Sequence, residues 1–333
     1  MVNAAVARTW RYTRRNTFLF PLVLLVLVLI VNYSFQPNML TPRVLNANLR
    51  SFMPLIILAV SQTIVILSGS IDLSVGTMMS LAAAFMVTRL SNDSATAAFW
   101  PVVAQGVGIG LIAGAVNGLC VSFIRLPAFV TTYATSYVFA GVALWILPRP
   151  GGFVPAELVR GYRGALPFNI PLGIFIILSV LLLWSVVRVT RYGSFLYAIG
   201  GNERSAFTSG VPVTWHRFTT HMLAGGIAGI AALFLILNTG SSDARIGNSM
   251  TLDSIVAVVL GGTAMSGGVG GIAGSIMGVL ALGFIRNIVS FANVFTWYQP
   301  LVDASIILLA LLSPGFGALV RSQLQGMKAG KRT

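Results

Sequence analysis

A chain of 333 residues that is 56% hydrophobic and 8% charged cannot cover its surface in water, because soluble domains carry about 25% charged residues. The composition excludes a soluble enzyme or binding domain of this length. The net charge of +14 does not indicate a nucleic-acid partner, since the basic residues stand at the ends of apolar segments, where lipid headgroups explain them. One cysteine, Cys120, excludes an internal disulfide and a cysteine-based metal cluster.

Apolar segments long enough to cross a bilayer, which needs about 20 residues, follow one another along the chain. They predict an all-α integral membrane protein with about ten transmembrane helices. Residues 1–16 form a basic cytoplasmic arm, 17–320 the transmembrane domain, and 321–333 a basic cytoplasmic tail. The expected helices lie near 17–35, 50–68, 72–89, 98–122, 128–147, 171–188, 215–238, 253–266, 271–289 and 298–318.

The placement of the basic residues predicts the orientation. On a ten-helix count, thirteen of the 21 basic residues fall on the face that carries both termini and the loop 189–214. The face richer in Arg and Lys is cytoplasmic in most membrane proteins. Both termini are therefore expected inside, and the Pro- and Gly-rich segment 148–170 is expected to form an irregular outer loop.

Two Gly- and Ser-rich stretches interrupt the apolar pattern, one in each half of the chain. Irregular backbone at membrane depth leaves N–H and C=O groups unpaired, so it persists only when buried in protein or lining a wet cavity. The stretches therefore predict broken helices beside a translocation pathway. The residues assigned to it are Ser68, Gly69, Ser70, Asp72, Ser74, Gly261, Gly262, Thr263 and Ser266. Their hydroxyls can face a polar solute or bond nearby backbone, and both readings stay open.

The two stretches also align with each other. Leu67–Ser70 matches Leu260–Thr263, and Ser74–Gly76 matches 268–270 after a shift of one residue, which suggests an internal duplication.

Glycines at four-residue spacing, Gly106 to Gly118, predict a helix face that another backbone approaches closely.

Acidic residues within apolar segments are costly and need partners. Asp72 and Asp253 each precede an expected helix, so both are predicted to cap helix N-termini. Asp303 and Arg286 stand inside late segments, and we expect them to form an ion pair.

The loop 189–214 contains signals for a short helix. Asn202 is a good N-cap, Glu203 suits the positive end of a helix dipole, and Gly210 suits a C-terminal stop. A two-turn helix over 203–209 is too short to be stable alone, so it implies a partner or a membrane surface. Ala206 and Phe207 are expected to dock in a groove, with Glu203 and Arg204 pairing at its rim. An interfacial helix without a protein partner is the alternative.

Enzymatic motifs are absent from the sequence. The only lysines, Lys328 and Lys331, stand in the tail, so no Walker A loop exists. His216 and His221 are five residues apart, a poor spacing for two metal ligands on one helix face. We therefore predict no catalytic residue, no metal site and no cofactor bound by this chain.

Four motifs follow one another along the chain, namely Ser68–Gly76, Leu126–Val130, Tyr197–Val211 and the segment 252–270. Together they resemble, in the same order and over roughly residues 50 to 320, the motifs of permeases in bacterial ABC sugar importers of the ribose-transporter type. Two departures stand out. Ser70 replaces a usual glycine, which is expected to stiffen the first break, and Thr251 replaces a frequent glutamate, so any role of that carboxylate is lost.

The resemblance implies a permease subunit of the bacterial inner membrane that moves a monosaccharide or related small polar solute by alternating access. It implies a second permease subunit (homodimer or heterodimer), a periplasmic sugar-binding protein, and a cytoplasmic ATPase that binds ATP and Mg. It also implies that the short helix is the coupling helix contacting the ATPase, through Asn202, Glu203, Arg204, Ser205, Ala206, Phe207, Thr208 and Ser209.

The alternative function is an ion-coupled secondary transporter. Such a transporter needs carboxylates at membrane depth as ion sites, and Asp72, Asp253 and Asp303 are the candidates. The sequence does not identify the sugar, because we expect selectivity to lie in the binding protein.

Overall fold

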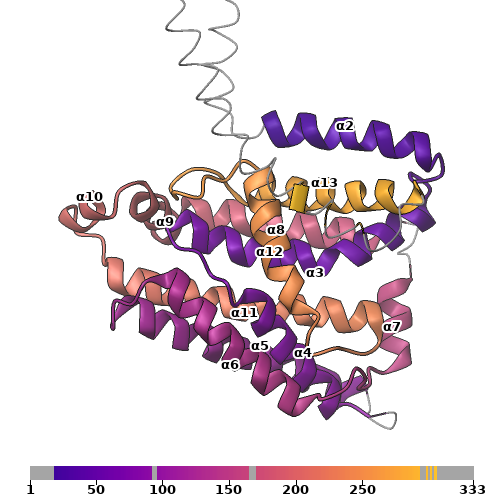
Figure 1. Ribbon diagram of the computed structural model, residues 1–333, viewed down its shortest axis with the longest axis horizontal. Coiled ribbons are helices and arrows are strands. Elements are labelled where there is room, and N and C mark those ends of the chain that lie inside the picture. The colour runs from indigo at the N-terminus through magenta and orange to yellow at the C-terminus, as the bar shows by residue number, and fades with distance from the viewer. Residues whose placement is uncertain are drawn as a thin grey trace, which may run out of the picture.

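A computed structural model describes residues 19–91, 96–164, 170–292, 298, 301 and 304–305. Within these ranges the named elements are all α-helices, and the only β pairing is an isolated antiparallel bridge between Gly151 and Ser242. The long helices run side by side as a bundle, while α12 crosses their direction (Figure 1).

The helices, in chain order, are α2 (Leu19–Phe35), α3 (Pro42–Leu67), α4 (Val75–Arg89), α5 (Thr96–Ser122), α6 (Ala128–Ile146), α7 (Ala156–Arg163), α8 (Leu172–Val189), α9 (Arg191–Gly201), α10 (Glu203–Thr208), α11 (Val213–Thr239), α12 (Gly247–Leu260) and α13 (Ile272–Phe291). Nine of the ten predicted transmembrane segments correspond to α2, α3, α4, α5, α6, α8, α11, α12 and α13. By length and composition, α3, α5, α6, α8, α11 and α13 can cross a membrane, and α2, α4 and α12 are shorter apolar helices. The chain is thus a multi-pass α-helical membrane protein.

Most of the tenth predicted segment, 298–318, lies outside the described residues, as do the arm 1–16 and the tail 321–333. The count of ten helices and the cytoplasmic location of both termini stay predictions. Two segments differ from expectation. The outer loop 148–170 contains the helix α7, and the loop 189–214 contains two helices, α9 and α10.

The centre of the bundle is formed by α3 and α11. The apolar stretch of α3 is 83% buried, whereas those of α6 and α8 are 22% and 11% buried. Helix α11 packs against α3, α4 and α5. Because α6 and α8 leave large apolar side chains uncovered, including Trp145, Leu182 and Leu183, their outer faces suit lipid or a second membrane subunit.

The predicted close approach of two helix backbones is confirmed. The glycine face of α5 meets α11, and a Cβ atom on Gly114 would overlap the His221 carbonyl oxygen and lie 3.1 Å from the Cα of Gly225. A Cβ on Gly110 would overlap the carbonyl oxygen of Gly225. Small residues at these positions therefore set the distance between the two helices.

The two ends of the bundle carry different structures. Helices α9 and α10 project at one end, and α7 lies at the other (Figure 1). The α7 end is held by Arg163, whose guanidinium donates to the Asn238 carbonyl at 2.6 Å, and by the Gly151–Ser242 bridge.

The role of Asp253 differs from the prediction. Helix α12 begins at Gly247, so Asp253 lies inside the helix and does not cap it. Its two carboxylate oxygens accept hydrogen bonds from the Arg286 guanidinium at 2.9 and 2.7 Å. The predicted partner of Arg286, Asp303, lies outside the described residues.

We expect charge reversal at Arg286 or Asp253 alone to lower the free energy of unfolding by about 2 kcal/mol, because each places like charges at a partly buried contact. The double variant Asp253→Arg/Arg286→Asp restores opposite charges and should recover at least half of that loss. Thermal unfolding of the detergent-solubilised protein measures the three changes. No recovery in the double variant would contradict the energetic importance of this pair.

Candidate functional site at the two helix breaks

The first break begins where α3 ends in a Schellman motif. Gly69 adopts the left-handed conformation (φ +78°), and its N–H donates to the Ile66 carbonyl at 2.9 Å. The Ser70 N–H donates to the Val65 carbonyl at 3.2 Å. These bonds satisfy carbonyls that the end of a helix would otherwise leave unpaired. Glycine is favoured at position 69 because other residues are strained at this φ.

The second break begins in the same way. Gly262 is left-handed (φ +79°), its N–H donates to the Val259 carbonyl at 2.9 Å, and the Thr263 N–H donates to the Val258 carbonyl at 3.2 Å. The aligned segments Leu67–Ser70 and Leu260–Thr263 therefore share a local geometry. The match ends there, because α4 starts at Val75 whereas Val269 and Gly270 still precede α13.

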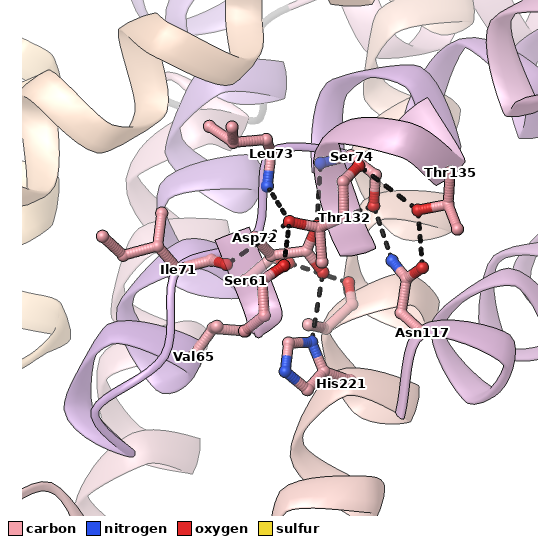
Figure 2. Close-up of polar contacts among 12 residues, drawn as sticks. Ser61, Val65, Ile71, Asp72, Leu73, Ser74, Asn117, Thr132, Thr135 and His221 are labelled. Atoms are coloured by element: carbon pink, nitrogen blue, oxygen red, sulfur yellow. Dashed lines mark hydrogen bonds and ion pairs between the residues drawn. The ribbon is translucent and has the colours of Figure 1, made fainter. Parts of the chain in front are cut away.

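Asp72 lies at the centre of a buried polar network (Figure 2). Its Oδ1 accepts hydrogen bonds from the Ser74 N–H at 2.8 Å and the Ser74 hydroxyl at 2.6 Å, and its Oδ2 lies 3.3 Å from Nδ1 of His221 on α11. Both Asp72 and Ser74 are fully buried. Asp72 therefore accepts a backbone N–H just before α4, but the N-cap position predicted for it is occupied by Ser74.

The network extends from Ser74 into two further helices. The Ser74 hydroxyl oxygen accepts from the side-chain amide of Asn117 on α5 at 2.7 Å, and the Asn117 oxygen accepts from the Thr135 hydroxyl of α6 at 2.7 Å (Figure 2). The first break is therefore tied to α5, α6 and α11. Hydrogen bonds of this kind are stronger in the low dielectric of a protein interior than in water.

Side chains from other helices also pair the backbone N–H groups at the start of α4. The Leu73 N–H donates to the hydroxyl oxygen of Thr132 on α6 at 3.0 Å, and the Gly76 N–H donates to that of Thr251 on α12 at 3.0 Å. Sequence reasoning assigned no role at the break to Asn117, Thr132, Thr135 or His221. A usable signal was present, because each is a polar residue inside an apolar helix that needs a partner.

The predicted pathway residues fall into buried and exposed groups. The Ser68 hydroxyl donates to the Val65 carbonyl at 2.7 Å, and the Thr263 hydroxyl oxygen accepts from the Gly271 N–H at 3.3 Å. Ser70 and Gly261 are also buried, Gly262 is half-buried, and Ser266 is exposed. In this conformation the hydroxyls of Ser68 and Thr263 therefore bond to the backbone, and that of Ser74 bonds to Asp72 and Asn117.

Some buried polar atoms near the breaks have no hydrogen-bond partner among the residues that the structure describes. They are both amide atoms of Gln62, on α3, and Nε2 of His221. Gln62 and His221 are fully buried. An unpaired buried polar group costs about 1–3 kcal/mol, so both side chains lie at an energetic cost in this conformation.

The short helix predicted at 203–209 is confirmed as α10. The Asn202 side-chain oxygen accepts from the Ser205 N–H at 2.9 Å, and Gly210 ends the helix in the left-handed conformation (φ +84°). Glu203 pairs with Arg217 of α11 at 2.8 Å, within the same chain.

One predicted contact on α10 needs correction. Ala206 is buried against Ile199, Val211 and Val213 of its own chain, so it is not available to a partner. Phe207 is 70% exposed and is the apolar side chain that this helix presents to the outside.

A cavity of about 760 Å³ connects this end of the molecule with the first break. Its lining includes Gly69 and Ser70 from the break, and Glu203 and Phe207 from α10. The basic side chains Arg125, Arg204 and Arg217 also border it.

A multi-pass bundle with two Gly-rich helix breaks and an exposed short helix at one end has the features of a membrane transport permease. Residues 44–311 match the family model described as "Branched-chain amino acid transport system / permease component", and the chain belongs to this family.

Curated relatives cover nearly the whole chain. The chain is 34% identical to the ribose import permease protein RbsC of Escherichia coli (strain K12), over 87% of this chain and 91% of that protein. It is 35% identical to RbsC of Bacillus subtilis (strain 168), over 89% and 90%. It is 30% identical to the L-arabinose ABC transporter permease protein AraH of Azospirillum brasilense, over 92% and 89%. No solved structure matches the chain significantly.

Proposed function

We propose that this chain is the transmembrane permease subunit of an ABC importer that brings a monosaccharide across the bacterial inner membrane. The observation that carries the proposal is the extended similarity to import permeases for ribose and L-arabinose. A D-allose transport permease of Escherichia coli and an autoinducer 2 import permease of Photorhabdus temperata are also similar. Their named solutes are small and polar, and most are sugars, although the family name refers to branched-chain amino acids.

The energy source in this proposal is a separate cytoplasmic ATPase that binds ATP and Mg. ATP binding closes the ATPase, which displaces α10, and the segments around the two breaks rearrange to open the pathway outward. A periplasmic sugar-binding protein delivers the solute, and hydrolysis resets the permease. A second permease subunit, identical or related, completes the pathway, and lipid covers the remaining apolar faces.

The contacts of α10 support its role as the coupling helix. Its inner face is fixed by Ala206, the exposed Glu203 braces its first turn by pairing with Arg217, and Phe207 is exposed. An exposed phenylalanine on a braced helix suits the apolar anchor of a protein interface. The residues proposed to face the ATPase are Asn202, Glu203, Arg204, Ser205, Phe207, Thr208 and Ser209.

The alternative of ion-coupled transport has less support. Two of its three candidate ion sites already have partners within the chain, since Asp72 bonds with Ser74 and faces His221, and Asp253 pairs with Arg286. The third, Asp303, lies outside the described residues. The relatives include a permease named as part of an ABC transporter.

Reconstitution in liposomes tests the proposal. The permease alone should not accumulate any monosaccharide against a gradient, whereas the complex with its ATPase and binding protein should do so when ATP is supplied. A protonophore should leave the ATP-driven uptake unchanged. Uphill uptake by the isolated chain would overturn the proposal in favour of ion coupling. So would a loss of uptake by the ATP-supplied complex when the protonophore is added.

Phe207→Asp is expected to weaken association with the ATPase at least tenfold, because it replaces the exposed apolar anchor of α10 with a charge. Phe207→Leu keeps an apolar side chain and should retain most of the binding. Co-purification of the ATPase with tagged permease, together with uptake, measures the effect.

Leu40→Asp is the control, since Leu40 is 65% exposed and lies in the segment between α2 and α3, outside α9 and α10. It should leave the ATPase bound. Equal binding by the wild type and Phe207→Asp would show that α10 is an interfacial helix without a partner.

A further inference from the structure

The end of α9 touches both helix breaks through backbone alone. A Cβ atom on Gly200 would overlap the carbonyl oxygen of Leu67, the last residue of α3, and would lie 2.5 Å from the nitrogen of Gly268 in the second break. A larger residue at position 200 would therefore have to displace one of the two breaks.

The two breaks also bond to each other at this point. The Gly268 N–H donates to the Leu67 carbonyl at 3.1 Å. A Cβ on Gly267 would lie 2.8 Å from the Cα of Gly69 and 2.9 Å from the Cα of Gly200. Three backbone segments, from the end of α3, from α9 and from the link between α12 and α13, thus meet at one junction of glycines.

A second contact joins α9 to the second break. The Tyr197 hydroxyl donates to the Gly270 carbonyl at 2.8 Å. Burial raises the pKa of Tyr197, although the nearby Arg188 charge opposes the shift, so the hydroxyl keeps its proton across the physiological range. Gly200 and Tyr197 therefore hold the second break at two places three residues apart on one helix.

Helices α9 and α10 form one mechanical unit. Asn202 ends α9 and caps α10, and Ile199 of α9 packs against Ala206 of α10 in a shared apolar cluster. Leu196 is fully buried in the main core. A displacement of α10 is therefore transferred to α9 without an intervening flexible loop.

We propose that α9 is the positioning element that moves both broken segments together, with Gly200 pressing on the junction and Tyr197 holding Gly270. The inference rests on the proposed function, in which α10 receives the movement of an ATPase. Contacts between backbones suit this role, because packed interiors transmit strain and no side chain is present to absorb the displacement by changing rotamer. One movement at the inner surface then reaches α3 and the α12–α13 link at the same time.

The test compares matched pairs of variants in the reconstituted complex, with solute uptake and ATP hydrolysis measured together. Tyr197→Phe removes only the hydroxyl that bonds to Gly270. Tyr192→Phe removes a hydroxyl from the same helix that lies 3.1 Å from the Thr220 hydroxyl of α11. This second hydroxyl bonds to neither break. We expect Tyr197→Phe to lower the number of solute molecules moved per ATP about fivefold, because the net free energy of one hydrogen bond corresponds to about that factor. Tyr192→Phe should keep a ratio near that of the wild type.

The second pair adds one carbon atom to neighbouring glycines of α9. A Cβ on Gly201 would meet no atom of the described residues within 4 Å, in contrast to one on Gly200. Gly200→Ala should lower uptake per ATP at least tenfold with the ATPase still bound, and Gly201→Ala should behave as the wild type. If Gly200→Ala does not accumulate in membranes, the tyrosine pair decides the question alone.

The inference is overturned if Tyr197→Phe keeps the wild-type ratio of uptake to hydrolysis, or if both tyrosine variants lose it equally. These outcomes differ from a failure of the proposed function, in which the wild-type complex itself would show no ATP-dependent uptake. We expect Tyr197→Phe to keep the ATPase bound, whereas Phe207→Asp should lose it. This difference separates the role of α9 from that of Phe207.

Discussion

Replacing Gly114 with leucine should strongly destabilise the folded protein. The Cβ of the new side chain would overlap the His221 carbonyl oxygen, so α5 and α11 would have to separate. Since α11 also packs against α3 and α4 at the centre of the bundle, the displacement would propagate into the core. We expect a loss of about 4 kcal/mol or more in the free energy of unfolding. The amount of monodisperse protein extracted from membranes and its unfolding temperature measure it.

The same helix supplies the control. A Cβ on Gly108 would have no neighbour within 4 Å, so Gly108→Leu adds the same side chain without a backbone collision. It should be extracted and should unfold as the wild type does. Gly114→Ala should already be damaging, because the collision begins at the Cβ atom. Wild-type yield and stability in Gly114→Leu would contradict the view that these glycines set the spacing of the two helices.

The sequence was sufficient for features that depend on local signals. The apolar lengths predicted nine described helices, and the signals at Asn202 and Gly210 placed α10. Helix starts were less accurate. The chain turns helical at Pro42, earlier than expected, because proline is favoured in the first helical turn and does not always mark a loop.

The features that sequence reasoning missed depend on contacts between distant segments. Asp253 resembled a cap because it precedes an apolar run, yet its partner, Arg286, is 33 residues away. Sequence reasoning assigned Gly200 no contact with the breaks, whereas at the end of α9 it packs on both broken segments. Unlike the glycine spacing of α5, these contacts between distant segments leave no periodic pattern in the sequence, so only the fold shows them.

The second large effect is expected at Asp72. Asp72→Ala removes the acceptor for both the N–H and the hydroxyl of Ser74 and the partner of His221 Nδ1, all at buried positions. Each buried polar group left unpaired costs about 1–3 kcal/mol, so we expect a total loss of about 4 kcal/mol. The start of α4 should loosen and uptake should fall with stability. Unfolding temperature and ATP-driven uptake in the reconstituted complex are the measurements.

Two further variants separate the network from general burial effects. Asp72→Asn keeps an oxygen that can accept both bonds from Ser74, so it should lose less than half as much stability as Asp72→Ala. Thr77→Ala, also buried in α4, removes a hydroxyl that donates only to the Ser74 carbonyl at 2.9 Å, and it should cost about 1 kcal/mol. If Asp72→Ala were no more destabilising than Thr77→Ala, the carboxylate would not be what holds the first break to α11. The break would then be held by the contacts of Thr132 and Thr251 with the backbone of α4.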